Sequence, residues 1–281
     1  MVADTLSRTM IGHRFKPLEI PWRQKDTMLY ALGVGATVKD ELPFLYEGKG
    51  PAVLPTYAVI PALRAMGNLR QLVKLKVSRL LHGEQAFELL RPLPANTTIT
   101  LESEVSELWD KGKAAVIGVK ATAVDDDGPL FRSHSTLFYL GGGGFGGESG
   151  PSTKNKNAPP DRAPDITISY PTSPEQGAIY RLSGDYVPLH IDPEFAQSAG
   201  YEKPFMHGLC TYGFAGRAVL HSLCDGDPSR FRSMEGRFAS RAEFEDPVIT
   251  KIWRVTDGEA ILQVENQNGE ILISQARVTH G

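Results

Sequence analysis

A weak internal repeat constrains the fold of this chain more than any other feature. When the second half is shifted onto the first by 150 to 155 residues, the matching residues keep their order along the chain. The matched pairs are Tyr30 with Tyr180, Leu32 with Leu182, Thr56 with Thr211, Tyr57 with Tyr212, Gly83 with Gly236, Pro94 with Pro247 and Thr97 with Thr250. Each match is weak by itself, and chance alignment is the alternative. Their shared order indicates a duplicated domain.

A segment of unusual composition lies between the two copies. Residues 141–165, GGGGFGGESGPSTKNKNAPPDRAPD, contain seven Gly and four Pro in 25 residues. A phosphate-binding loop is the alternative for such a glycine cluster, but no Gly-Lys-Ser/Thr follows it. We interpret the segment as a linker between a first domain at 1–140 and a second at 166–281. The chain length of 281 residues fits two domains or one large one.

Both halves show helix patterns followed by strand patterns. The first half predicts helices near residues 26–32 and 57–66, and strands at 86–90, 98–105, 114–122 and 131–140. The second half predicts a helix at 211–223 and an antiparallel meander at 248–255, 259–265 and 270–278. A helix followed by a curved antiparallel sheet, twice over, predicts an α+β protein with two similar domains.

Composition excludes several classes of protein. Hydrophobic residues make up 41% and charged residues 22%, so the sequence predicts a packed core rather than a disordered chain. The net charge of -3 offers no electropositive field for nucleic acid. Two cysteines cannot form a disulfide framework, and no Cys/His spacing resembles a zinc site. No apolar run has the length of a signal peptide or membrane span, so we expect an intracellular protein.

The most informative run is YRLSGDYVPLHIDP at residues 180–193, followed downstream by His207-Gly208. It places the carboxylate of Asp185 five residues before the imidazole of His190, with glycine and proline bending the chain between flanking elements. A carboxylate and a neutral histidine that share one water can act as a general acid/base pair. Gly208 opens the expected helix, whose N-terminal N–H groups suit a developing oxyanion. A hydrogen-bonded turn is the alternative reading of such an Asp and His.

These residues resemble the signature of type-2 (R-specific) enoyl-CoA hydratases of the MaoC-like family, which have the hot-dog fold. The resemblance extends over nearly the whole chain, including residues 30–36, 81–85, 110–112 and 143–147. The chain is similar to the hydratase domain of peroxisomal multifunctional enzymes and to their bacterial relatives. The resemblance therefore implies two tandem hot-dog domains, each a long helix wrapped by an antiparallel β-sheet.

The resemblance also implies roles for particular residues. Asp185 and His190 would be the catalytic dyad that holds the attacking water, and Gly208 would donate the N–H of the oxyanion site. The positions that correspond to acyl-CoA contacts are His82, Gly83, Lys111, Tyr186, Val187, Pro188, Leu189 and Phe238. Supporting positions are Tyr180, Asp192, His207 and Glu47. No metal ligand and no separate cofactor are implied, because CoA is part of the substrate.

The implied activity is the reversible hydration of trans-2-enoyl-CoA to (3R)-hydroxyacyl-CoA in fatty-acid metabolism. His190 would take a proton from water and Asp185 would deliver one to C2, while Gly208 stabilises charge on the thioester oxygen. Two rivals stay open: an acyl-CoA binding protein with impaired catalysis, and a 3-hydroxyacyl-thioester dehydratase acting on carrier-protein substrates. The first rival is motivated by Val187, because the family motif has an asparagine at that position.

The sequence further predicts one active site per chain. Residues 30–35, which align with the dyad segment, contain neither Asp nor His, so the first half is expected to bind CoA and the acyl chain without catalysis. We expect the two halves to pair internally and the protein to form a homodimer. The C-terminal SQARVTHG is not the Ser-Lys-Leu type of peroxisomal signal. A free-standing bacterial enzyme would be cytoplasmic, and a domain of a eukaryotic multifunctional enzyme would be peroxisomal.

Overall fold

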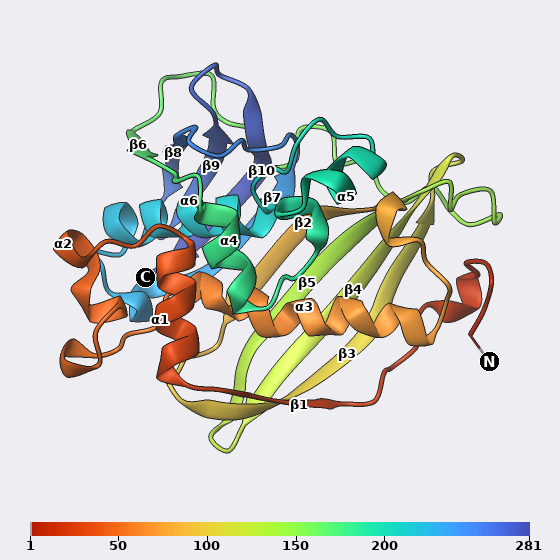
Figure 1. Ribbon diagram of the computed structural model, residues 1–281, viewed down its shortest axis with the longest axis horizontal. Helices are drawn as coiled ribbons and strands as arrows, with labels where there is room; N and C mark the ends of the chain where they lie inside the picture. Colours follow the sequence, from red (N-terminus) through yellow and green to blue (C-terminus); the bar gives the residue numbers. More distant parts are fainter. Residues whose placement is uncertain (1) are drawn as a thin grey trace.

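A computed structural model of the chain describes residues 2–281 and contains one ten-stranded antiparallel sheet (Figure 1). The strands of the first half are β1 (Leu18–Trp22), β2 (Leu80–Leu89), β3 (Thr97–Asp110), β4 (Ala114–Asp125) and β5 (Gly128–Leu140). Its helices are α1 (Gln24–Gly33), α2 (Val38–Glu41) and α3 (Val59–Gly67), the last preceded by the 3₁₀ turn η4 (Pro55–Ala58).

The second half repeats this order of elements. Its strands are β6 (Ile166–Tyr170), β7 (Phe231–Phe238), β8 (Val248–Thr256), β9 (Glu259–Glu265) and β10 (Ile271–His280). Its helices are α4 (Gln176–Tyr180), α5 (Pro193–Ser198) and α6 (Gly208–Leu223). The predicted helix at 211–223 and the meander of the last three strands are confirmed, with shifts of at most three residues at their ends.

The strand order shows the duplication directly. It runs β1-β3-β4-β5-β2-β7-β10-β9-β8-β6, so each strand of the first half has its counterpart at the mirrored place in the second. The halves join where β2 pairs with β7, from Glu84 opposite Arg237 to Glu88 opposite Ser233. Gly83 and Gly236, matched by the repeat, lie on these two central strands. The predicted pairing of the halves and the double hot-dog fold are therefore confirmed.

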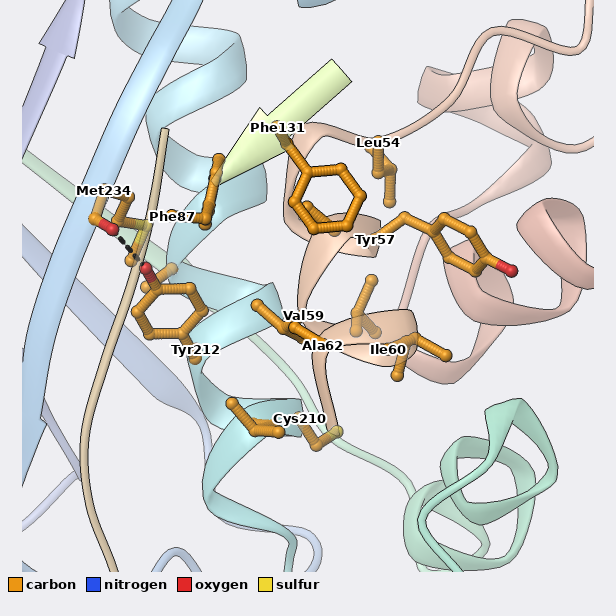
Figure 2. Packing of buried hydrophobic residues seen from close by; sticks show 14 of the residues in the cluster. Leu54, Tyr57, Val59, Ile60, Ala62, Phe87, Phe131, Cys210, Tyr212 and Met234 are labelled. Atoms are coloured by element: carbon orange, nitrogen blue, oxygen red, sulfur yellow. Dashed lines mark hydrogen bonds between the residues drawn. The ribbon is translucent and has the colours of Figure 1, made fainter. Parts of the chain in front are cut away.

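Helices α3 and α6 pack against the sheet and close a single core. Helix α3 contacts β3, β4 and β5, whereas α6 contacts β7, β8 and β10 and also touches η4. Figure 2 shows Tyr212 of α6 beside Met234, whose carbonyl oxygen accepts a 2.6 Å hydrogen bond from the tyrosine hydroxyl. Tyr212 and Phe214 are fully buried, so both rings belong to the core. Burying their rings stabilises the joint between helix and sheet.

Three strands were not predicted from the sequence. The edge strands β1 and β6 have only five residues each, and β1 contains Pro21, which a central strand would not tolerate. Strand β7 carries three charged residues and a glycine in its eight residues, so its alternation is weak. Strand β2 also begins six residues earlier than expected, at Leu80. Pairing with neighbouring strands, which local sequence does not encode, forms these segments.

The segment from 141 to 165 contains no helix or regular strand, but it is held against both halves. The Asp110 carboxylate accepts hydrogen bonds from the N–H groups of Gly144 and Gly146 at 2.8 and 2.9 Å. The Asn157 amide donates to the Glu235 carboxylate at 2.9 Å and to the Gln275 carbonyl at 3.0 Å. The segment is therefore anchored along its length. The domain limits themselves stay a prediction. Across residues 2–281, no helix is long and apolar enough to cross a membrane.

Candidate active site

The predicted dyad lies in residues 181–192, which we call the dyad loop, between α4 and α5. Gly184 ends the first 3₁₀ turn with φ of 133°, a conformation that glycine adopts readily. Pro188 begins the second turn, where its fixed φ is favourable and its missing N–H costs nothing. This sequence of turns carries Asp185 and His190 back toward the start of α6, and leaves both partly buried.

The hydrogen bond of His190 fixes which ring nitrogen can act as a base. Nδ1 lies 2.8 Å from the carbonyl oxygen of Phe205, so this nitrogen must carry the proton that is donated. In the neutral ring, Nε2 then keeps its lone pair. Burial lowers the pKa of His190 despite opposing contributions from the Phe205 carbonyl and Asp185. His190 is therefore a neutral imidazole with a basic Nε2 near pH 7.

Asp185 is shifted in the opposite direction. Burial raises the pKa of its carboxyl group above the ordinary value, while His190 and the N–H of Val187 lower it to a lesser extent. The two pKa values therefore approach each other and the groups titrate as a pair. Proton transfer is easiest between groups of similar pKa, so the arrangement suits a pair that passes a proton through a bound water.

Gly208 is the first residue of α6, and its neighbour His207 precedes the helix as the N-cap. The N–H groups at a helix start have no acceptor within the helix and carry a partial positive charge. A Cβ at Gly208 would lie 3.1 Å from the Phe238 ring, so a larger residue there would push this ring aside. Nε2 of His207 lies 3.2 Å from the carbonyl oxygen of Asp185, which brings the helix start next to the dyad.

Two predicted substrate contacts close the site from the sheet. The ring of His82, on β2, lies 4.9 Å from the ring of Phe238, on β7. Burial lowers the pKa of His82 to about 4, so this ring is uncharged at neutral pH. Its Nε2 is buried and has no hydrogen-bond partner within residues 2–281. The structure therefore brings His82, its strand neighbour Gly83 and Phe238 to the same end of α6 as the dyad.

The remaining residues of the dyad loop differ in exposure. The Tyr186 ring is 56% exposed, with the Arg181 guanidinium 5.0 Å from its centroid. Pro188 is exposed, whereas Val187 and Leu189 are partly buried. Val187 replaces the family's asparagine, and only its backbone N–H approaches Asp185, at 3.5 Å from Oδ1. Tyr180 is fully buried beneath the loop, with its ring 4.9 Å from that of His207.

The polar contacts of Lys111 and Asp192 are made outside the group formed by the dyad, Gly208, His82 and Phe238. Lys111 sits in the turn between β3 and β4, so β4 and β5 separate it from β2, roughly 10–15 Å at the usual strand spacing. Its ammonium group donates to the carbonyl of Ser149. Asp192 caps α5 by accepting from the N–H groups of Glu194 and Phe195.

Glu47 makes no polar contact with these residues. It is exposed in a 3₁₀ turn, and its carboxylate makes no hydrogen bond or ion pair within the described residues 2–281. Over the same residues, no group of three or more His, Cys, Asp or Glu side chains is arranged to hold a metal ion.

A buried ion pair between the halves was missed at the sequence level. Arg217 of α6 donates from Nε to Oε1 of Glu41 at 2.7 Å and from Nη1 to the Val34 carbonyl at 2.9 Å. His221 lies 2.9 Å from the same carboxylate oxygen. The side chains of Arg217 and Glu41 are only 3% and 1% exposed. An arginine in the middle of an otherwise apolar helix was the one sequence signal of this network.

Comparison with known proteins matches both halves. The model of the MFE-2 hydratase 2 N-terminal domain matches residues 21–141, and the model of the MaoC like domain matches residues 154–274. A Dictyostelium discoideum protein named "Probable enoyl-CoA hydratase 2" is 38% identical, over 95% of this chain and 94% of its own length. The chain belongs to the MaoC-like hydratase 2 family. The resemblance drawn from the dyad loop is thereby confirmed.

Further similar proteins include one that is much longer than this chain. The "3-hydroxyacyl-thioester dehydratase Y" of Mycobacterium tuberculosis is 42% identical, covering 91% of this chain and 90% of its own. "Peroxisomal multifunctional enzyme type 2" of the mouse is 37% identical over 95% of this chain, which spans 38% of that longer protein. Among solved structures, a MaoC-like dehydratase from Phytophthora capsici has a TM-score of 0.88 at 30% identity and covers 98% of both chains.

Proposed function

We propose that this protein catalyses the reversible hydration of trans-2-enoyl-CoA to (3R)-hydroxyacyl-CoA in fatty-acid metabolism, as a hydro-lyase. The observation that carries the proposal is the dyad at the start of α6. A neutral His190 with a basic Nε2 and a carboxyl group of raised pKa lie beside a helix N-terminus. The name of the Dictyostelium relative, "Probable enoyl-CoA hydratase 2", supports enoyl-CoA hydration.

The helix N-terminus makes the addition feasible. In a 2-enoyl thioester, C3 accepts a hydroxyl group only if negative charge can collect on the carbonyl oxygen. The Gly208 N–H would donate to that oxygen, and one such donor stabilises the transition state by about 3 kcal/mol. His82 and Phe238 would exclude water from the thioester side of the site, which strengthens this hydrogen bond.

The dyad would supply the proton transfers. Nε2 of His190 takes a proton from water as the hydroxyl group bonds to C3, and Asp185 gives a proton to C2 on the same face. The C2=C3 double bond is consumed, and the proton then returns from His190 to Asp185 to restore the pair. The reaction starts with Asp185 protonated and Nε2 of His190 unprotonated. The raised pKa of Asp185 and the lowered pKa of His190 both favour this starting state.

The proposal includes one active site per chain. The repeat places Gly35 opposite Asp185, at a shift of 150 residues. A side chain at Gly35 would lie 2.6 Å from the Phe214 ring and 3.1 Å from Nη1 of Arg217, and φ there is +79°. The corresponding position in the first half is therefore filled by side chains of α6. The first half is left to bind CoA and the acyl chain.

The proposal extends to partners and location. Acyl-CoA is the substrate, with no cofactor besides the CoA that it carries, and the protein forms a homodimer. The mouse relative is named peroxisomal, so we propose an intracellular location: peroxisomal in a eukaryotic host and cytoplasmic in a bacterial one.

Hydration of crotonyl-CoA tests the function. We expect the absorbance of the enoyl thioester to fall on addition of the protein, and chiral analysis to give the (3R) product. Intact acyl-CoA binding without any absorbance change would instead support a binding protein with impaired catalysis. The M. tuberculosis relative named a thioester dehydratase motivates a parallel assay with the carrier-protein thioester. If kcat/KM is much higher for the carrier-protein thioester, that thioester would replace acyl-CoA as the proposed substrate.

The pKa of His190 leads to a prediction about pH. Protonation of Nε2 removes the base, and a lowered pKa means that protonation occurs only at more acidic pH. We therefore expect the acid limb of kcat/KM to have its midpoint below 6.5, the value of an unperturbed histidine. The rate at pH 6 should be less than about fourfold below that at pH 7.5, given a limb displaced in this direction. A midpoint at or above 6.5, with folding intact by circular dichroism, would contradict the burial of His190.

A further inference from the structure

We propose that His207 is a positioning residue that holds Asp185 in register with His190 and the N-terminus of α6. This inference rests on the proposed hydratase function, which assigns chemistry to the dyad but none to His207. The residue stands directly before Gly208, as the N-cap of α6. It is 1% exposed, so it is not available to solvent.

The contacts of His207 and His190 are reciprocal, and we call them the histidine clasp. His190, in the dyad loop, donates from Nδ1 to the Phe205 carbonyl, two residues before His207. His207 in turn donates from Nε2 to the Asp185 carbonyl, at 3.2 Å. Each segment thus offers a side chain to the backbone of the other. The two rings lie close together in a tilted arrangement, with centroids 3.9 Å apart and planes inclined by 31°.

The clasp keeps the His207 ring uncharged. Nε2 of His207 carries the donated proton, so Nδ1 holds a lone pair, and it is buried without a partner within residues 2–281. A proton on Nδ1 would place a positive charge against the His190 ring in a buried site. Burial and His190 lower the pKa of His207 well below its usual range. His207 can therefore serve as a constant donor without competing for protons in the reaction.

Other contacts to Asp185 are weak by comparison. Within the dyad loop, the backbone bonds close local turns and do not reach α6. Val187 has no side-chain amide, and its N–H lies 3.5 Å from Oδ1 of Asp185, at the limit of a hydrogen bond. The His207 bond is thus the link between the Asp185 backbone and the helix that carries Gly208. Losing it frees the carboxyl group to move relative to the substrate.

A matched pair of amide variants tests the positioning role. In His207→Gln the amide N–H group can reach the Asp185 carbonyl, whereas in His207→Asn it is one bond short. We expect kcat to fall about 100-fold in His207→Asn, as for a misplaced catalytic group, with KM within about threefold of wild type. We expect kcat to stay within about fivefold of wild type in His207→Gln, because the donor is restored. Equal losses in both variants, or no loss in His207→Asn, would overturn the proposal.

A measurement independent of turnover separates this proposal from the hydratase function. ¹⁵N NMR of histidine-labelled protein reports the tautomer and pKa of each ring. In wild type and His207→Gln we expect His190 protonated on Nδ1 with a pKa below 6.5, and in His207→Asn a pKa moved toward 6.5 as the dyad loop loosens. An unchanged His190 titration in a folded His207→Asn variant would overturn the clasp, even if enoyl-CoA hydration is measured. If the wild type lacks hydratase activity but shows these spectra, only the proposed function fails. Should His207→Asn not fold, His207→Met provides the donor-free variant for both measurements.

Discussion

Replacing Asp185 with asparagine is expected to lower kcat by about 10³-fold, because general acid/base catalysis by a placed group contributes 10²- to 10⁴-fold. Asparagine has nearly the same shape but cannot give a proton to C2 or receive one from His190. His190→Ala removes the base and should cause a loss of similar size. Rates of crotonyl-CoA hydration for the three proteins, followed at the enoyl absorbance, measure both effects.

Asp192 offers a matched control for the aspartate variant. It lies in the same loop and is exposed, and its carboxylate caps α5 rather than facing the dyad. Asparagine is as good an N-cap as aspartate, so Asp192→Asn should leave kcat within about twofold and stability almost unchanged. Near-normal activity in both Asp185→Asn and His190→Ala would refute the dyad. A loss of kcat in Asp192→Asn as large as in Asp185→Asn would show that substitutions in the loop lower activity in general, and not through the Asp185 carboxyl group.

Replacing Glu41 with glutamine is expected to destabilise the protein by about 3–5 kcal/mol. The guanidinium of Arg217 would then be buried in the joint between the halves without a counter-charge. In the wild type, burial raises the pKa of Glu41, but hydrogen bonds from His221 and Arg217 outweigh it and lower the pKa to about 2. The carboxylate is therefore ionised at neutral pH. Urea unfolding followed by tryptophan fluorescence gives the free energy of unfolding.

Two further variants separate the buried pair from ion pairs in general. Glu148, whose side chain is 70% exposed, pairs with Arg8 at 3.0 Å. Glu148→Gln is the same chemical change at the surface and should cost less than about 1 kcal/mol. The double variant Glu41→Gln with Arg217→Met should recover much of the lost stability, because no uncompensated charge is left inside. A small effect of Glu41→Gln by itself would mean that water reaches Arg217.

The core elements followed from local patterns. The meander of β8, β9 and β10 has turn residues between alternating strands, and α6 has its apolar residues at helical spacing, so both were predictable. Strands β1, β6 and β7 were not, since their own residues favour strand only weakly and pairing decides their conformation. On residue type alone, Arg217 was not expected to be buried. Its partner Glu41 comes from the other half of the chain, 176 residues away.

In the candidate site, too, some residues were predictable from the sequence and others were not. Asp185, His190 and Gly208 stood out because they belong to one recognisable motif, and the fold brings them together. Glu47 and Lys111 were named from family positions; both lie in turns, β4 and β5 lie between β3 and β2, and their roles stay predictions. The Phe205 carbonyl could not be found from sequence, because every residue carries a carbonyl group. Only its orientation toward Nδ1 of His190 gives it a role.

By itself the sequence determined the duplication, the helix and strand types of most segments, and the motif that identifies the family. These depend on residues near one another along the chain, or on residue identity alone. The tertiary structure decided that the two halves share one sheet, that α6 fills the place opposite Asp185 in the first half, and that two histidines clasp the dyad loop to α6. Those features depend on contacts between distant segments, whose distances and directions are set only when the chain is packed.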